Sequence, residues 1–193
     1  LEHYLVTQGR EWERYAWIKA RALSADRADE LAAIVRPFVY RKYLDYGAFA
    51  AVRELHAQIR AEVARREMSD HIKLGPGGIR EIEFIAQAFQ LIRGGRDPSL
   101  QLRPTLGVLA LLAQKGLLPP QTADELAEAY VFLRRLEHRL QYLEDAQTHK
   151  LPAGDEDRAL VARAMGFPAW DSFAAVLAAQ RERVSRHFED VFS

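Results

Sequence analysis

The chain has 193 residues, enough for one sizeable domain with a hydrophobic core. Hydrophobic residues make up 49% and charged residues 28% of the composition, which is typical of a soluble globular protein. Lysine plus arginine equals aspartate plus glutamate, 27 each, which argues against a general nucleic-acid or membrane-surface binder. The lack of cysteine excludes disulfides, thiolate nucleophiles and cysteine-based zinc sites, and it is compatible with a cytoplasmic location.

No apolar run approaches the roughly 20 residues that are needed to span a bilayer. No signal peptide is visible either. The chain begins with leucine rather than methionine and already reads as the middle of a protein. We therefore expect residues 1–193 to be a single domain excised from a longer protein.

Helical periodicity runs through almost every segment. The first predicted helix carries apolar residues at spacings of three, four and seven, namely Trp12, Tyr15, Ala16 and Leu23. An amphipathic helix is predicted from residue 47 to about residue 68, with Val52, Leu55, Ile59 and Val63 on one face. After a loop over residues 69–78, a strongly apolar helical stripe follows, and Gly94 and Gly95 end it.

The second half of the chain continues the pattern. Pro104 and Thr105 open a short leucine-rich helix that closes at Lys115 and Gly116. Thr122 and Glu125 have the spacing of a capping box. The helix behind it has a seam close to a heptad, formed by Leu126, Tyr130, Leu133, Leu136, Leu140 and Leu143.

A polar break follows that helix. A short helix then ends at Met165 and Gly166, and Asp171 or Ser172 is predicted to cap a last helix. No alternating β-branched run or hairpin turn is present. We therefore predict an all-α fold, a bundle of roughly seven or eight helices in one domain.

The glycine-rich loop before the apolar stripe is the first candidate site. Gly75, Gly77 and Gly78 surround Pro76, and Lys73 precedes them. A helix N-terminus offers free N–H groups and a partial positive charge, so the loop can hold an anion. It is no Walker A loop, and the alternative is a tight helix–helix turn that needs positive φ angles.

Arg80, Glu81 and Glu83 follow the loop directly and form the second candidate. Paired carboxylates can bind Mg²⁺ or transfer protons, but residues two apart on a helix do not face the same way. The alternative is an arginine–glutamate network that pins neighbouring helices, because buried charges need partners.

The segment "GREWERYAWIKAR" provides the third candidate. Arg14 and Arg21 lie seven residues apart, which places them on one face of a continuous helix, and Lys19 can reach a neighbouring surface. Such a row suits a phosphate-bearing substrate or an acidic neighbouring domain. The alternative is a solvated face with aromatic anchors on the core side.

His138 and His149 suggest a metal site, with Glu137 and Asp145 nearby. On a helix the two histidines would lie ~16 Å apart along the axis, so one metal ion cannot bridge them. A hydrogen-bonded structural histidine is the better interpretation, and no metal site is predicted.

Four stretches together resemble the glutamine synthetase adenylyltransferase family, whose members are also called adenylyl-removing enzymes. In order they are "GREWERYAWIKAR", "RPFVYRKYLDYGA", "IKLGPGGIREIEFIAQAFQLIRGGR" and "AYVFLRRLEHRLQYLEDAQTHKLP". The resemblance covers nearly the whole chain. Residues 77–84 match the family's segment Gly-Gly-Ile-x-Asp/Glu-Ile-Glu-Phe. The sequences at residues 12–15 and 92–96 resemble the N-terminal, adenylyl-removing half of the family protein.

The resemblance implies a nucleotidyltransferase in which each half pairs a polymerase-β-like catalytic domain with a helical domain. One half attaches AMP to a tyrosine of glutamine synthetase, and the other removes it with phosphate to give ADP. It also implies Mg²⁺ and ATP or ADP as cofactors of the parent enzyme, glutamine synthetase and a PII-type signal protein as partners, and a cytoplasmic enzyme.

The family's metal-binding carboxylate motif, Gly-Ser-x-x-x-Asp-x-Asp, does not occur in this chain. The resemblance therefore implies the helical domain alone, without catalytic residues and inactive as a fragment. We expect residues 1–23 to pack against the missing catalytic domain. We call residues 73–84, the glycine loop and the helix start that follows it, the signature segment. Our hypothesis is that Arg80 and Glu83 fix its loop while Lys73 faces the cleft between domains.

Overall fold

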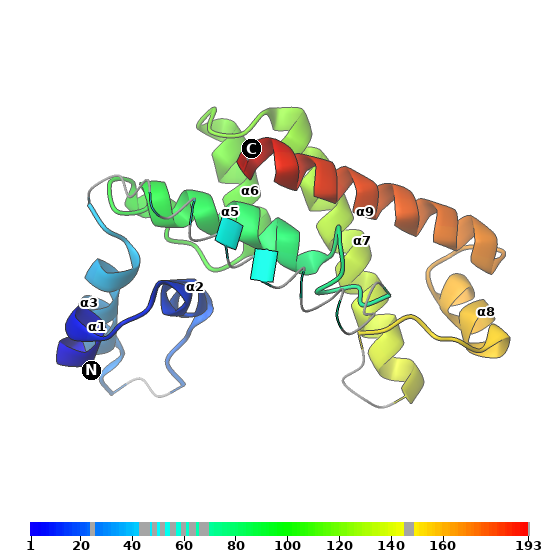
Figure 1. Ribbon diagram of the computed structural model, residues 1–193, viewed down its shortest axis with the longest axis horizontal. Coiled ribbons are helices and arrows are strands. Elements are labelled where there is room, and N and C mark those ends of the chain that lie inside the picture. The colour runs from blue at the N-terminus through cyan, green and yellow to red at the C-terminus, as the bar shows by residue number, and fades with distance from the viewer. Residues whose placement is uncertain are drawn as a thin grey trace.

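The computed structural model describes residues 1–23, 26–42, 70–144 and 149–192, together with scattered positions between 47 and 65. Its helices are α1 (Glu2–Thr7), α2 (Glu11–Lys19), α3 (Ala28–Val39), α5 (Ile79–Arg93), η1 (Pro98–Leu100), α6 (Thr105–Gln114), α7 (Pro120–Glu144), α8 (Asp155–Ala164) and α9 (Trp170–Phe192) (Figure 1). Within these ranges the only β-type pairing is an isolated antiparallel bridge between His71 and Lys150. The predicted all-α bundle is confirmed.

Helix α5 is the centre of the fold. It contacts α2, α6, α7 and α9, and it is buried around most of its circumference. A helix that is apolar on almost every side has to be enclosed by its neighbours. Figure 1 shows α5 running along the length of the molecule, with α1–α3 at one end and α7–α9 at the other.

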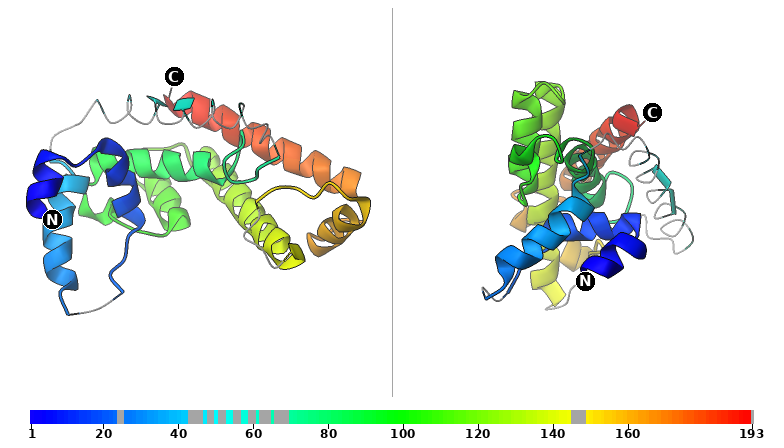
Figure 2. Two further views of the ribbon diagram at one scale, coloured as in Figure 1. Left: turned by 60° about the horizontal axis from the view of Figure 1, so that its bottom comes forward. Right: turned by 90° about the vertical axis from the view of Figure 1, so that its left-hand side faces the viewer.

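The two ends of the molecule are built differently. At the N-terminal end, α3 packs against α1 and α2. At the other end, α7 packs against α6, α8 and α9, so that these helices form the larger bundle. The left view in Figure 2 shows α1–α3 and α8 at opposite ends of an elongated molecule.

The predicted apolar seams of the two longest helices form the core. Leu126, Leu133, Leu136 and Leu140 of α7 are buried. The matching stripe of α9 is buried as well, at Phe173, Leu177, Val184 and Phe188. The 3.6-residue period thus identifies the correct faces, because burial of one continuous stripe is what stabilises such helices.

Two predicted helix starts are wrong. Helix α7 begins at Pro120, so Thr122 lies inside its first turn instead of capping it. Proline is favoured at the first helical position because its missing N–H would be unpaired there anyway. Helix α9 begins at Trp170, before both predicted caps, and the Ser172 hydroxyl donates to the Ala169 carbonyl.

The N-terminal segment also departs from the prediction. It forms two helices, not one, and they meet near Gly9, where an added Cβ would lie 2.5 Å from the Leu5 carbonyl oxygen. Trp12 and Leu23, predicted for the core stripe, are 53% and 89% exposed, whereas Tyr15 is buried. Helix α2 ends before Leu23 can join the stripe.

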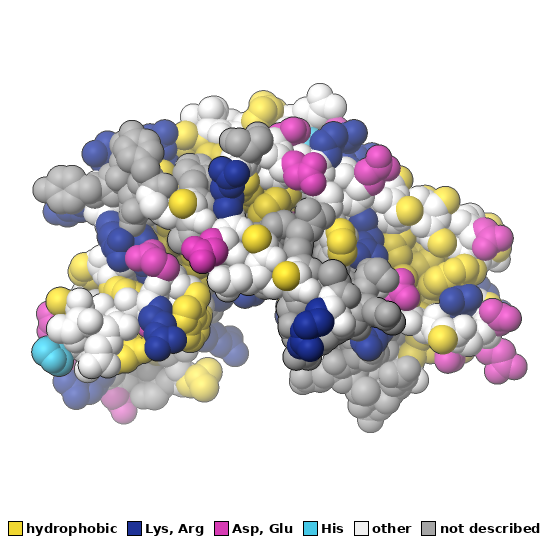
Figure 3. All heavy atoms as spheres, in the orientation of Figure 1, with side chains coloured by type: hydrophobic (Ala, Val, Ile, Leu, Met, Phe, Trp, Pro, Cys, Tyr) yellow, Lys and Arg dark blue, Asp and Glu magenta, His cyan; other side chains and the backbone are white. Residues whose placement is uncertain are grey.

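The helix predicted from residue 47 to 68 lies largely outside the described residues, although its scattered described positions are helical. None of the helices in the described ranges is long and apolar enough to cross a membrane. Basic and acidic side chains are interspersed over the face of the molecule in Figure 3, in keeping with their equal numbers.

Candidate functional site

The glycine loop is a tight turn that rests on α9. Gly77 has a φ of +67°, which favours glycine, and a Cβ built there would lie 2.0 Å from the Arg181 carbonyl oxygen. In return, the Arg181 Nε donates to the Pro76 carbonyl at 2.8 Å. The glycines therefore allow close contact between the loop backbone and the α9 backbone.

The N–H groups at the start of α5 are already paired. Gly78 N donates to the Gly75 carbonyl, Ile79 N to the Ile72 carbonyl, and Arg80 N to the Lys73 carbonyl, at 3.0–3.2 Å. Free N–H groups were the reason for expecting an anion here, and the loop itself has taken them. The turn interpretation of this segment fits the geometry better than the anion-binding one.

Glu81 fixes the loop from inside. Its side chain is buried, and one carboxylate oxygen accepts hydrogen bonds from Gly77 N at 3.0 Å and from the Ser185 hydroxyl at 3.2 Å. A buried carboxylate is stable only with such partners. The carboxylate thereby ties the turn to α9, a role that the sequence hypothesis gave to Arg80 and Glu83.

Arg80 and Glu83 lie at the edge of this arrangement. Arg80 Nη1 is 3.8 Å from a Glu83 carboxylate oxygen, and its guanidinium lies over the Phe84 ring, 4.9 Å from the centroid. Lys73 is half-buried, and its side chain makes no hydrogen bond or ion pair with any residue in the described ranges. Glu81 and Glu83 thus contact different neighbours, as the two-residue spacing predicts.

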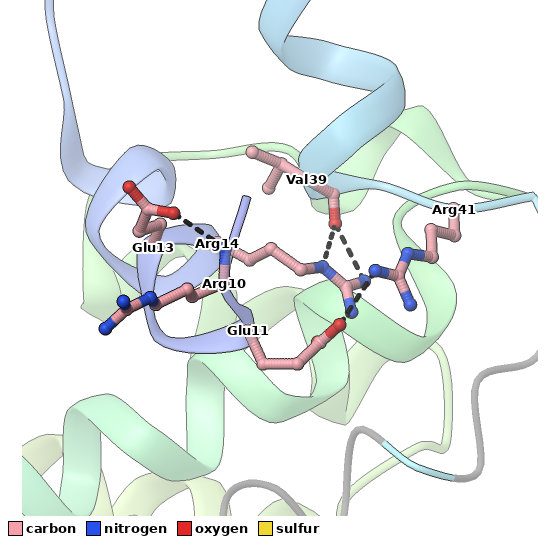
Figure 4. Close-up of polar contacts among 6 residues, drawn as sticks. All are labelled: Arg10, Glu11, Glu13, Arg14, Val39 and Arg41. Atoms are coloured by element: carbon pink, nitrogen blue, oxygen red, sulfur yellow. Dashed lines mark hydrogen bonds and ion pairs between the residues drawn. The ribbon is translucent and has the colours of Figure 1, made fainter. Parts of the chain in front are cut away.

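Arg14 is fully buried and joins α2 to α3. Its Nε and Nη2 donate to the Val39 carbonyl at 3.2 and 3.0 Å, and its Nη1 contacts the Glu11 carboxylate at 2.6 Å (Figure 4). The other Glu11 oxygen accepts from Arg41 at 2.7 Å. Arg14 therefore pairs the free carbonyl at the α3 C-terminus, a group that any helix end leaves unsatisfied.

Arg21 does not share a helical face with Arg14, contrary to the prediction, whereas Lys19 reaches a neighbouring segment as predicted. Helix α2 ends at Lys19, and Ala20 is extended, so Arg21 lies outside the helix. The Lys19 Nζ donates to the Arg103 carbonyl at 2.6 Å and to the Thr105 hydroxyl at 2.8 Å. Burial lowers the pKa of Lys19, an effect that the nearby Glu83 opposes.

His71 and His149 lie side by side where the loop meets the segment after α7. Their ring centroids are 5.2 Å apart, and Ile72 N donates to the His149 carbonyl. His71 Nδ1 accepts from Lys73 N and Leu74 N, which places its proton on Nε2. Burial, reinforced by His149 and Lys150, lowers the pKa of His71, so the neutral ring is favoured.

His149, and not His138, lies beside the buried Glu137. Its Nδ1 is 3.1 Å from a carboxylate oxygen of Glu137, whereas His138 is exposed. The spacing of these two histidines in the sequence already argues against a metal site that they share. Within the described ranges no three histidine or acidic side chains are placed so that they can hold a metal ion.

The sequence did not single out two further basic residues, Arg36 and Arg103. Both residues line the same pocket as Arg21, and the three arginines lie on three separate segments. No spacing rule connects residues on separate segments, so no signal in the sequence could have grouped them.

Comparisons with known proteins relate the chain to enzymes that modify other proteins with nucleotides. Residues 53–192 match the family model described as GlnD PII-uridylyltransferase. Over all of its length the chain is 67% identical to the bifunctional glutamine synthetase adenylyltransferase/adenylyl-removing enzyme of Aromatoleum aromaticum, and 64% identical to that of Chromobacterium violaceum. It spans only 20% and 21% of these relatives. The enzyme of the same name from Neisseria meningitidis is 51% identical, with 21% of its length covered.

Proposed function

Because the chain belongs to the family of the bifunctional glutamine synthetase adenylyltransferase/adenylyl-removing enzymes and matches the GlnD PII-uridylyltransferase model, we propose that it is a helical supporting domain of such an enzyme. The parent enzyme would add AMP to a tyrosine of glutamine synthetase or remove it by phosphorolysis. The sequences at residues 12–15 and 92–96 favour the N-terminal, adenylyl-removing half.

The observation that carries this proposal is the inward orientation of the signature segment. Hydrogen bonds within the loop, or from the loop region to α9, satisfy the Gly77 N–H, the Glu81 carboxylate and the N–H groups at the start of α5. Residues used in this way hold a scaffold in place instead of reacting with a substrate. Mg²⁺ and ATP or ADP would act at the catalytic domain, and this chain would position that domain or its substrate.

The first helices offer a surface for that catalytic domain. Val6 and Trp12 are 80% and 53% exposed, and Tyr4 is exposed as well, although all three are apolar or aromatic. Large apolar side chains left exposed on neighbouring helices suit a surface that another domain covers. This supports the expectation that residues 1–23 pack against the catalytic domain.

An activity comparison tests the proposal. Adenylylated glutamine synthetase would be incubated with Mg²⁺ and phosphate, and ADP release would be followed. Three proteins would be compared: this chain, the same chain extended upstream through the carboxylate motif, and the upstream segment without residues 1–193. We expect activity only in the extended protein.

Each alternative result would contradict a different part of the proposal. ADP release by the 193-residue chain alone would show that it contains the chemistry, and Glu81 and Glu83 would then be the first residues to replace. Full activity of the upstream segment alone would remove the supporting role. Helical circular dichroism of each protein would show that an inactive sample is folded.

A second candidate function is docking of a PII-type signal protein. It is favoured by the name of the matching family, GlnD PII-uridylyltransferase, which refers to a PII-type protein. A pulldown with a PII-type protein separates the two functions, because a supporting domain needs no such contact. Retention by this chain, and its loss on replacing Trp12 with serine, would favour docking.

A further inference from the structure

A pocket of about 320 Å³ lies between α2, α3 and the segment around residues 101–103. This volume is at the lower end of the range of small-molecule sites, about 300–1,000 Å³. Its apolar part is lined by buried Ile18, Val35 and Val39, together with the partly buried rings of Trp17 and Tyr40. The pocket is thus a concave apolar surface that water or a ligand must fill.

Three arginines line the same pocket. Arg21 comes from the segment after α2, Arg36 from the last turn of α3, and Arg103 from the segment before α6. Within the described part of the chain, their side chains make no hydrogen bond or ion pair. The lining includes one acidic residue, Asp29, so positive charge dominates.

Arg36 and Arg103 both act on Tyr40, which lines the same pocket. Burial raises the pKa of Tyr40, and both guanidiniums oppose that effect. Positive charge from two different segments thus acts on the aromatic side of the pocket, and such a potential favours an anion there.

Buried polar residues hold the walls of the pocket in place. Arg14 binds α2 to the C-terminal carbonyl of α3, and Lys19 binds α2 to the backbone of Arg103. Gln90 of α5 donates to the Leu100 and Leu102 carbonyls at 2.6 and 2.7 Å. The backbone that carries Arg103 is therefore fixed before any ligand arrives, which lowers the entropic cost of binding.

We infer that this pocket binds a phosphate monoester with an aromatic group, the phosphate between Arg21, Arg36 and Arg103 and the aromatic group on the apolar floor. Guanidinium groups suit phosphate because they donate two parallel hydrogen bonds. The rings of Trp17 and Tyr40 suit a planar group. The inference goes beyond the proposed function, since it needs neither the catalytic domain nor glutamine synthetase.

Isothermal titration of the 193-residue chain tests the inference, after its helical circular dichroism has been verified. The probes are AMP, phenyl phosphate and inorganic phosphate, each at constant ionic strength. We expect saturable binding of the two esters, tighter than that of inorganic phosphate. Equal affinity for inorganic phosphate would overturn the role of the apolar floor.

The double variant Arg36→Gln/Arg103→Gln should weaken ester binding at least about tenfold, the loss of one or two charged hydrogen bonds. Both side chains are exposed, so the variant should keep the melting temperature of the parent chain. Arg163→Gln is the matched control, because it removes an exposed arginine from α8 at the other end of the molecule. No saturable binding of any probe, or equal weakening by the control, would overturn the inference.

A failure of the binding experiment can be distinguished from a failure of the activity experiment. Failure to bind the esters would leave the supporting role untouched, because ADP release by the extended protein does not depend on this pocket. Conversely, an inactive extended protein would not affect binding measured on the chain alone.

Discussion

Within the part of the chain that the structure describes, the polar groups of the glycine loop are paired, whereas several charged groups at the pocket between α2 and α3 are not. In the loop, the N–H groups, the Glu81 carboxylate and the Pro76 carbonyl all find partners within the chain. At the pocket, buried Arg14 and half-buried Lys19 are paired, while three exposed arginines have no partner in the described ranges. The glycine motif thus builds the scaffold here, whereas the three arginines at the pocket come from separate segments that no single motif groups.

Replacing Gly77 with alanine should have the largest effect on stability. The positive φ costs about 1–2 kcal/mol for a residue with a Cβ, and the clash with the Arg181 backbone adds a further cost of about 1–3 kcal/mol. Urea unfolding followed by circular dichroism would measure the loss. If Gly77→Ala were neutral, the loop would not rest on α9 as described.

Gly116→Ala is the matched control for that change. Gly116 has almost the same φ, +66°, but an added Cβ there meets no atom within 4 Å. It should lose only the cost of the backbone conformation, about 1–2 kcal/mol. The difference between the two variants therefore isolates the contact between the loop and α9.

Arg14→Met should come next, with a loss of about 2–4 kcal/mol. The change removes both donors to the Val39 carbonyl and leaves the Glu11 carboxylate without this partner. Arg163→Met, at an exposed position of α8, should change stability by less than about 0.5 kcal/mol. Equal melting temperatures of the two variants would show that Arg14 does not clamp α2 to α3.

The sequence predicted what depends on local periodicity and missed what depends on contacts between distant segments. The stripe of α5 and the seam of α7 follow from spacing, because one face of each helix must be buried. The row of Arg14 and Arg21 failed because α2 ends at Lys19. The role of Glu81 needed Ser185, more than a hundred residues away, and no spacing rule reaches that far.

The His71 ring adds a dependence of stability on pH to the loop. Its folded pKa lies below the unfolded value of about 6.5, so the unfolded chain binds more protons as the pH falls through that value. Stability should therefore be full above pH 7 and decline as the pH drops below about 6.5. His71→Asn, whose side-chain oxygen can accept from the same N–H groups, should decline less in urea unfolding between pH 7.5 and 5.5. An equal decline would place the titrating group elsewhere.

Lys73→Ala should have the smallest effect on stability, within about 0.5 kcal/mol, because its side chain has no partner in the described ranges. In the extended enzyme the same change should lower the rate of ADP release, if Lys73 faces the catalytic domain as proposed. Melting temperature and activity, measured on the same preparation, separate the two roles. A fall in both would make Lys73 another part of the loop scaffold, whereas a fall in activity alone would make it the one signature side chain that serves the neighbouring domain and not the turn.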